Sequence, residues 1–468
     1  RLPDSSAEAV VPAAESLASV SARLREAESF VACLAAQDMF DERAAVLTGQ
    51  VKTLRASFDA ALAYYNRRLA EIPDETWNAL LAANESLQAV RFPLEERRDE
   101  VREMLPPEQE AIVQDLAVDG YHGWSEMYDT IVSRIKIRHD GEELSVGQAA
   151  NKLHHPDRAV RRQLFGEWER SWAAHEDLCA AALNRIGGFR LAVYARRGWP
   201  SVLKEPLRYN RMTERTLNRM WEAIEEAKPV FVQYLKRKAE LLGLERLSWE
   251  DVDAPLTEDR PFIGYDEGAS LVVEQFAGFS PHLAEFAEKA LRERWVEAED
   301  RPGKRPGGFC TSFPVSGQTR IFMTYGGTPS NIATLAHELG HAYHDFVMKD
   351  LPELAKQYAM NVAETASTFA EWILTDAMVQ KAENDERRLV LLDEKVQNSI
   401  AFFMNIHARF LFELKFYEER RGGMVTPERL NELMLEAQRS AYQDALDGYH
   451  PHFWASKLHF YLTDVPFY

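Results

Sequence analysis

Apolar residues recur at every third or fourth position along most of the chain, with charged residues between them. This spacing is typical of amphipathic α-helices. Near the N-terminus it predicts long helices over residues 15–36 and 41–69, and further along it predicts another over 158–172. Runs rich in β-branched and aromatic residues are few. The pattern therefore predicts a mainly α protein.

A few short segments depart from the helical pattern. The run Ile131–Arg138 lies just before an Asp-Gly turn and predicts a short strand. Two further β-prone runs, Phe309–Phe313 and Arg320–Tyr325, are joined by a loop-forming Pro-Val-Ser-Gly sequence. Together these two runs predict a hairpin. Thr328 and Pro329 follow it as the cap and first residue of a new helix.

That helix covers Asn331–Lys349, where apolar residues again recur at helical spacing. It contains the pattern H-E-x-x-H, formed by His337, Glu338 and His341. Residues four positions apart share one face of a helix, so both imidazoles can reach one metal ion. Zinc held by three protein ligands keeps a position for water, and a neighbouring carboxylate can act as general base. The alternative is an ordinary surface helix that carries two histidines and a glutamate by chance.

A zinc site of this kind needs a third protein ligand. His344 lies one turn beyond the histidine pair, and we interpret it as a residue that supports a ligand or packs beside the site rather than as a ligand. Glu364 is the best candidate, since it lies in the mostly apolar helical stretch Tyr358–Met378 and a buried carboxylate needs a partner. Two readings of Glu371 stay open: it accepts a hydrogen bond from a ligating imidazole, or it pairs with a surface cation.

Composition narrows the classes of partner and compartment. The formal net charge of the 468 residues is −19, which argues against nucleic acid, because phosphate contacts need a basic surface. No apolar run approaches the roughly 18 residues that span a bilayer. The N-terminal RLPDSSAEAV lacks the regions of a signal peptide. The three cysteines form no disulfide framework. We therefore expect a cytoplasmic protein without membrane or nucleic-acid partners.

Several motifs occur in a fixed order: GKRPGGFC (303–310), IFMTYGGT (321–328), LAHELGHAYH (335–344), AETAST (363–368) and WASKLHFYLTDVPFY (454–468). This set resembles the M3 family of zinc metallopeptidases, and most closely its oligoendopeptidase F branch, relatives of thimet oligopeptidase. The resemblance implies an almost wholly helical, two-lobed fold with a long substrate channel. It also implies an N-terminal helical domain over residues 1–140 and a catalytic domain over 141–468.

The resemblance implies that His337, His341 and Glu364 bind one Zn²⁺ ion. It makes Glu338 the base that later protonates the leaving amine. These are the assignments at the metal itself.

The resemblance further implies that His459 contacts the substrate near the scissile bond, and that Tyr461 lies near a position that helps to hold the oxyanion. The family's other oxyanion tyrosine is expected a few residues after Tyr468. Either that tyrosine lies beyond this sequence, or Tyr468 replaces it.

The leading hypothesis is a zinc-dependent oligopeptidase that cuts internal bonds of short unstructured peptides, with the peptide lying along the 320–325 strand. A second hypothesis is a dedicated processing or peptide-modifying zinc enzyme with one biosynthetic substrate. A third, of another class, is a catalytically silent peptide-binding protein, but all four residues expected at the metal are present. The oligomeric state is left open.

Overall fold

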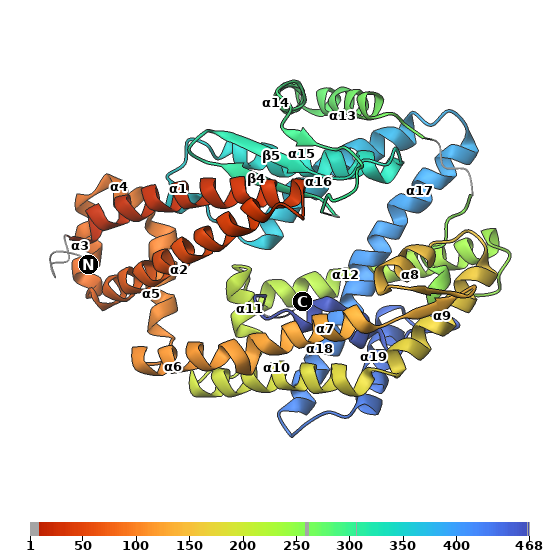
Figure 1. Ribbon diagram of the computed structural model, residues 1–468, viewed down its shortest axis with the longest axis horizontal. Helices are drawn as coiled ribbons and strands as arrows, with labels where there is room; N and C mark the ends of the chain where they lie inside the picture. The colour runs from red at the N-terminus through yellow and green to blue at the C-terminus, as the bar shows by residue number, and fades with distance from the viewer. Residues whose placement is uncertain (1–8, 258–261, 306, 466, 468) are drawn as a thin grey trace. The chain divides into compact units, whose positions relative to one another are not determined.

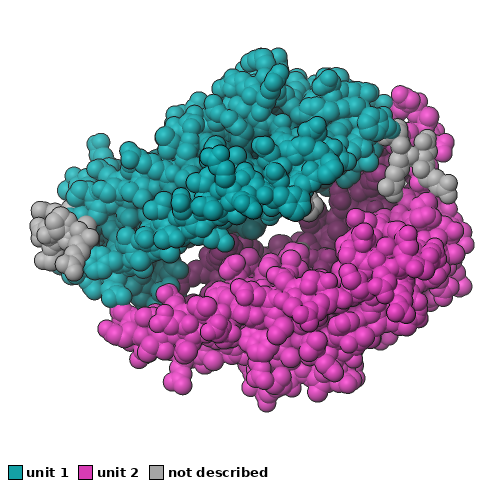
Figure 2. Space-filling view, viewed as in Figure 1, with its two compact units in different colours: residues 1–104, 260–381 teal, residues 105–259, 382–468 magenta. Residues whose placement is uncertain are grey.

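The computed structural model describes residues 9–257, 262–305, 307–465 and 467. Over these residues the chain is mainly helical with two small sheets, as the hydrophobic pattern predicts (Figure 1). It forms two compact units, residues 1–104 with 260–381 and residues 105–259 with 382–468 (Figure 2). No helix in the described part of the chain combines the length and apolar character that a membrane-spanning segment requires.

Each unit is built from two stretches that are far apart in the sequence. The units are defined by contacts in space, whereas the predicted boundary near residue 141 separates sequence domains. That boundary stays a prediction.

The first unit contains the N-terminal helices and the predicted metal-binding helices. Its elements are α1 (Val10–Gln37), α2 (Glu42–Glu71), α3 (Asp74–Ala83), α4 (Glu85–Ala89), α5 (Arg91–Arg102), α13 (Tyr265–Phe279), α14 (Pro281–Arg292), β3 (Val296–Glu297), β4 (Phe309–Phe313), β5 (Gln318–Phe322), α15 (Pro329–Val347), η4 (Glu353–Lys356) and α16 (Met360–Gln380). The two long N-terminal helices predicted from the apolar spacing are confirmed as α1 and α2.

The predicted hairpin is confirmed as β4 and β5, but it belongs to a three-stranded sheet with the order β3-β5-β4. β5 pairs with β4 on one side and, in parallel, with β3 on the other. The backbone N–H groups of Met323 and Tyr325 continue this pairing, with N···O distances of 3.0 Å to Glu297 and Ala298. The predicted peptide path along residues 320–325 is therefore wrong for residues 320–322, because this part of the strand already has a neighbour on each side. The two edge strands of this sheet are β3 and β4.

The second unit is almost entirely helical. Its elements are α6 (Pro107–Ala117), η2 (Val118–His122), α7 (Gly123–Arg134), β1 (Ile137–His139), β2 (Glu142–Leu144), α8 (Val146–Lys152), α9 (Arg158–Ala173), α10 (Glu176–Arg196), α11 (Lys204–Tyr209), α12 (Glu214–Leu241), η3 (Trp249–Asp251), α17 (Asp385–Ile400), η5 (Ala401–Asn405), α18 (Ile406–Arg420), α19 (Pro427–Ala441), α20 (Phe453–Ser456) and η6 (Leu458–Tyr461). Its main core is rich in aromatic residues, among them Trp172, Phe412 and Trp454.

The strand predicted over Ile131–Arg138 is wrong in its first half. α7 continues to Arg134, because Tyr128, Ile131 and Ile135 are spaced for one helical face and all three are buried in the core of the second unit. Only Ile137–His139 forms a strand, and it pairs with Glu142–Leu144 around the predicted turn. The fully buried Ile135 thus belongs to the end of a helical face rather than to a strand.

Candidate metal centre

The helix α15 begins where the sequence predicts. The Thr328 side chain accepts a hydrogen bond from the backbone N–H of Asn331 at 3.2 Å, and Pro329 occupies the first helical position. Ile332, Leu335 and Leu339 are each 0% exposed and form the face that packs into the core of the first unit. This buried face fixes the rotation of the helix about its axis, and with it the direction of the two predicted histidine ligands.

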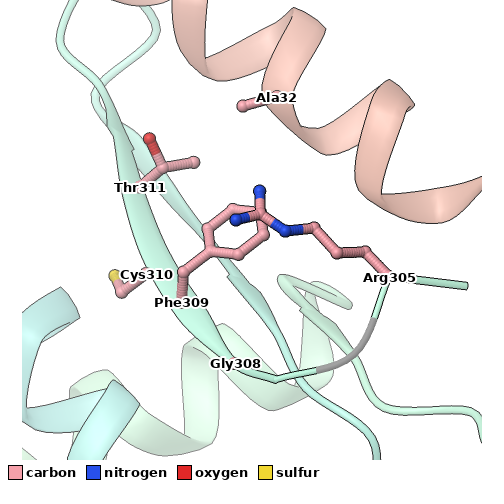
Figure 3. A pocket seen from close by; sticks show the side chains of 6 residues that line it. All are labelled: Ala32, Arg305, Gly308, Phe309, Cys310 and Thr311. Carbon is pink, nitrogen blue, oxygen red and sulfur yellow. The ribbon is translucent and has the colours of Figure 1, made fainter. Parts of the chain in front are cut away.

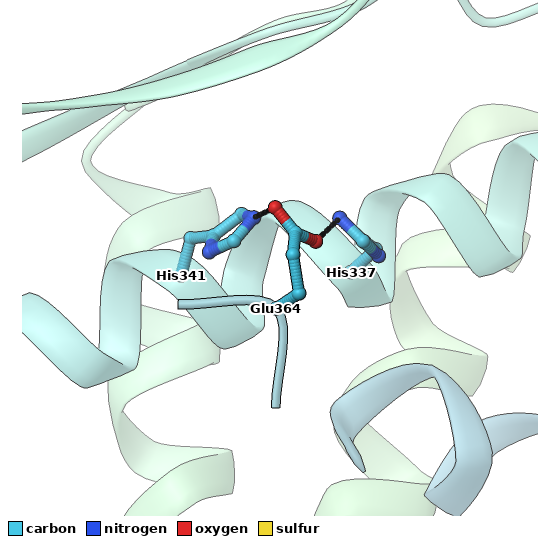
Figure 4. Close-up of side chains that lie close together, drawn as sticks. All are labelled: His337, His341 and Glu364. Atoms are coloured by element: carbon cyan, nitrogen blue, oxygen red, sulfur yellow. Dashed lines mark ion pairs between the residues drawn. The ribbon is translucent and has the colours of Figure 1, made fainter. Parts of the chain in front are cut away.

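His337 and His341 lie on α15 and Glu364 lies on α16 (Figure 4). Glu364 places one carboxylate oxygen 3.4 Å from Nε2 of His337 and the other 3.8 Å from Nε2 of His341. In the described part of the chain these three residues form the group whose ligand atoms all lie within 4.8 Å of one another. The structure thus brings together the three residues that the sequence selects as ligands.

The donor set fits a zinc ion. Two imidazole nitrogens and one carboxylate oxygen are a ligand combination of catalytic zinc, which keeps its fourth position for water or substrate. His337, His341 and Glu364 converge on one point from two neighbouring helices, which is what a shared ion requires. These three side chains can therefore bind one metal ion from the positions that the two helices give them.

The close approach of α15 and α16 depends on Gly340. A Cβ atom at this position would lie 2.8 Å from Cβ of Ala370 and 2.9 Å from the Ala366 carbonyl oxygen. Side chains do not tolerate such distances, so the two helices pack this closely because residue 340 has no side chain. Sequence reasoning missed this role. Its signal was the pair of small residues Ala336 and Gly340, one turn apart beside the histidines.

Glu371 lies two turns after Glu364 on the same helix. Its Oε2 is 3.4 Å from Nδ1 of His337, while the other ring nitrogen of His337 points to Glu364. The partial burial of His337 lowers its pKa, but the hydrogen bond to Glu371 and the nearby carboxylates raise the pKa by more. This geometry favours the reading in which Glu371 orients a ligating imidazole.

Glu338 projects from the same turn as the ligands but is only 7% exposed. Burial raises the pKa of its carboxyl to about 7. Its Oε2 has no hydrogen-bond partner among the described residues. Its Oε1 lies next to Gly308, where a Cβ atom would be 3.4 Å away. Gly308 is a second residue that sequence reasoning missed, and the GG pair before β4 was its only signal.

His344 does not join this group. Its ring packs against that of Tyr358, with the centroids 4.4 Å apart. The interpretation of His344 as a packing residue agrees with this position.

The other predicted site residues belong to the second unit. His459 is exposed in η6. Protein atoms that displace water from its ring, and the charges of Arg409 and Lys457, lower the pKa of His459 to about 4. Its imidazole is therefore neutral at neutral pH. The predicted Tyr468 lies outside the described residues.

Tyr461 is fully buried in the core of the second unit. Its ring stacks on Tyr128 with the centroids 3.6 Å apart. Its hydroxyl has no hydrogen-bond partner among the described residues. A donor to a substrate oxyanion must reach the substrate, so the role assigned to Tyr461 requires a path to a hydroxyl that the structure encloses. That role stays a prediction.

Two protein families and several known proteins are similar to this sequence. The model of "Peptidase family M3" matches residues 152–468, and the "Oligopeptidase F" N-terminal model matches 68–137. An oligoendopeptidase F homologue of Lactococcus lactis is 23% identical over 97% of this chain and 77% of its own length. Oligopeptidase PepF of Bacillus subtilis is 23% identical over 85% of this chain and 60% of its own length.

Solved structures share the fold. A protein from Chlamydophila abortus superposes with a TM-score of 0.86 at 19% identity, covering 99% of this chain and 79% of its own. Oligoendopeptidase-F from Enterococcus faecium gives a TM-score of 0.68 at 17% identity, covering 96% and 78%. The predicted fold class and the predicted family are both confirmed. Because one family model matches more than half of the sequence, the chain belongs to peptidase family M3 and is a peptidase of the metallopeptidase type.

Proposed function

We propose that the protein is a zinc-dependent metalloendopeptidase that hydrolyses internal bonds of short, unstructured peptides. The observation that carries the proposal is the convergence of His337, His341 and Glu364 with a buried carboxylate, Glu338, beside them. Membership in a family of peptidases supports peptides as the class of substrate. The preference for short peptides rests on the oligoendopeptidase and oligopeptidase names of the relatives.

His337, His341 and Glu364 would hold the metal. A zinc ion bound there supplies a Lewis acid that polarises a carbonyl and lowers the pKa of a bound water to near 7. Glu371 keeps the His337 ring in the orientation that directs Nε2 toward Glu364, since its carboxylate accepts from the opposite ring nitrogen.

Glu338 carries the proton transfers. Its Oε2 is buried and has no competing hydrogen-bond partner among the described residues, so it is free to accept a proton from the attacking water. The same carboxyl then gives that proton to the leaving amine, which balances the hydrolysis. Gly308 leaves room for a peptide beside Oε1 because it presents no side chain.

The peptide is assigned to the unpaired edge of β4 rather than to β5. An extended peptide adds to a sheet by pairing with exposed backbone groups, and β5 already has two neighbours. The open edge begins at Gly308, next to Glu338. Contact of His459 and a tyrosine with the oxyanion remains part of the proposal, with a neutral His459 ring as donor. The three free cysteines are consistent with the cytoplasmic location that we also propose.

The Glu338→Gln variant tests this function. It should bind one zinc ion per chain, measured by metal analysis, and cleave an internally quenched peptide roughly 10²–10⁴-fold more slowly than the original protein. The matched control is Glu288→Gln on the exposed face of α14, which should leave turnover unchanged. Unchanged turnover in Glu338→Gln would remove Glu338 from the role of base.

A further inference from the structure

A cavity of about 210 Å³ lies in the first unit at the start of β4. It is lined by Ala32 of α1 and by Arg305, Gly308, Phe309, Cys310 and Thr311 (Figure 3). The Arg305 side chain extends over the Phe309 ring, and its guanidinium reaches toward Thr311 and Ala32. The Cys310 thiol points away to the other side of the strand. The cavity therefore has one cationic group, beside the Phe309 ring and the Thr311 hydroxyl.

Arg305 is exposed, and its backbone is held in place while its side chain has no ion-pair partner among the described residues. Its backbone N–H donates to the Ala36 carbonyl at 2.9 Å, which ties this loop to the end of α1. Its guanidinium carbon lies 5.9 Å from the centroid of the Phe309 ring. Within residues 9–257, 262–305, 307–465 and 467, the guanidinium has no carboxylate or carbonyl partner. It is thus available to an anion from outside the chain.

Neighbouring cations of the same loop differ from Arg305. Arg301 pairs with Glu297 at 3.3 Å and with Glu299 at 3.1 Å. Lys304 pairs with Glu297 at 2.9 Å and donates to the Met323 carbonyl at 2.6 Å. These two side chains have structural partners that hold the loop. Unlike these two side chains, Arg305 forms no ion pair with the described residues.

The cavity is adjacent to the proposed base through Gly308, which lines the cavity and also lies against the Glu338 carboxylate. Successive residues of a strand point to opposite faces, so Phe309 and Thr311 face the cavity while Cys310 faces away from it. A peptide paired with the edge of β4 alternates in the same way. Every second side chain of such a peptide would project to the face of the sheet on which Arg305 lies, and the one nearest Gly308 would come closest to the guanidinium.

The far end of the same edge is closed. Ser29 of α1 donates from Oγ to the Ser312 carbonyl at 2.7 Å, and its Oγ also lies 2.7 Å from the Thr311 hydroxyl. A ligand is therefore limited to the part of the edge near Gly308 and Arg305. It cannot displace α1 without breaking these buried hydrogen bonds.

We propose that Arg305 and this cavity form a subsite for one carboxylate of the bound peptide. The inference rests on the proposed function, and it adds a preference for peptides with an acidic group near the cleaved bond. A guanidinium binds a carboxylate through two parallel hydrogen bonds, and this charge-assisted pairing is stronger than a hydrogen bond between neutral groups. The carboxylate comes either from an Asp or Glu side chain or from the C-terminus of a short peptide.

The experiment compares quenched peptides that carry Glu or Gln at each position around one cleavage site, each with a free or amidated C-terminus. The original protein should cleave one acidic series with a kcat/KM roughly 10- to 100-fold above that of its amide counterpart. Arg305→Ala should bring that ratio to about one. Arg305→Lys should keep part of the preference, because a lysine retains the charge but cannot donate two parallel hydrogen bonds to one carboxylate. The matched control is Arg292→Ala, which removes a charge from the exposed face of α14.

If only the exchange of Glu for Gln changes kcat/KM, the subsite binds a side-chain carboxylate. If only amidation of the C-terminus changes kcat/KM, the subsite binds the α-carboxylate. Equal kcat/KM values for all four peptide forms would overturn the proposed subsite. A decrease in kcat/KM that is equal for acidic and neutral peptides in Arg305→Ala would also overturn it. If no peptide is cleaved, the proposed function fails, and binding decides the subsite separately. Calorimetry should then show tighter binding of the acidic peptides to Glu338→Gln than to Glu338→Gln combined with Arg305→Ala, and equal binding would overturn it.

Discussion

Gly340 of α15 lies against Ala370 of α16 so closely that a Cβ atom on the glycine would be 2.8 Å from Cβ of the alanine. The two histidines are on the first helix and Glu364 is on the second. The separation of these helices therefore sets the distance between the imidazole and carboxylate ligands. A contact outside the metal site thus controls its dimensions.

We predict that Gly340→Ala weakens metal binding and lowers stability. The added methyl group must push α16 away, which costs about 1–3 kcal/mol in a packed core and withdraws Glu364 from the histidines. Zinc competition with a fluorescent chelator and thermal unfolding measure the two effects. Gly278→Ala in α13 is the control, since a Cβ there meets no atom within 4 Å. Gly340→Ala with unaltered zinc affinity would contradict this role.

Removal of the metal should abolish peptide cleavage, and added Zn²⁺ should restore it.

Glu371→Gln should reduce zinc affinity by roughly 10- to 100-fold, because the amide holds the His337 ring less firmly than a carboxylate does. Affinity is measured by titration of the metal-free protein. If Glu371 is a surface group without a role at the metal, Glu371→Gln will bind zinc as tightly as Glu288→Gln.

The hydroxyl of Tyr461 offers a test that separates packing from catalysis. Since this buried hydroxyl lacks a hydrogen-bond partner among the described residues, Tyr461→Phe should leave the free energy of unfolding unchanged or slightly higher. The turnover number then tests the oxyanion role. A decrease of roughly 10²–10³-fold in kcat supports that role, and an unchanged kcat makes Tyr461 a core residue only.

Acid stability should depend on a buried chain of ionisable groups in the second unit. The Glu169 carboxylate contacts Nδ1 of His450 and lies 2.6 Å from Nδ1 of His452, whose Nε2 is 3.0 Å from Glu176. Burial would raise the pKa of Glu169, but the two histidines lower it to about 2. Burial would lower the pKa of His452, but the two glutamates raise it.

The signs of these two shifts define a pH window. The contribution of Glu169 is present above its ordinary pKa of 4.5 and is lost as the pH falls toward 2. The contribution of His452 is present below its ordinary pKa of 6.5 and is lost as the pH rises through its raised value. Stability from this chain is therefore greatest between these two ordinary values.

We predict that Glu169→Gln lowers the free energy of unfolding by about 2–3 kcal/mol near pH 5.5. The difference from the original protein should shrink as the pH approaches 2. Urea unfolding at several pH values checks this. A difference that stays constant with pH would mean that packing of the side chain, rather than its charge, stabilises the second unit.

The parts of the site that could be predicted from sequence are those that depend on the spacing of residues only a few positions apart. The pair His337 and His341 is visible because four residues make one helical turn, and the Thr328 cap is visible in the residues beside it. The long N-terminal helices follow from apolar periodicity for the same reason. Glu364 is selected as the carboxylate of an apolar stretch. Its side chain is 47% exposed in the structure, so the burial assumed for it is wrong, although Glu364 does lie beside both histidines.

What could not be predicted depends on contacts between distant segments. Gly340 and Gly308 matter through atoms of other elements, and no local pattern shows that a Cβ atom would collide at Gly340 or would lie close to Glu338 at Gly308. The composition of residues 320–325 fits an edge strand as well as a central strand. Pairing with β3 makes β5 the central strand. Arg305 lies in a loop-forming run whose composition does not distinguish it from the paired Arg301 and Lys304.

The division of each unit into two separated stretches has a consequence for synthesis. Ser29 meets Thr311 across 282 positions, and the Tyr128 hydroxyl donates to the Ala455 carbonyl across 327. A ribosome therefore releases the N-terminal helices long before the sheet that packs against α1 exists. Such long-range closure is slow and leaves apolar faces exposed meanwhile. A fragment starting at residue 141 would keep all three metal ligands and the base, but it would lack the helix that packs against β4.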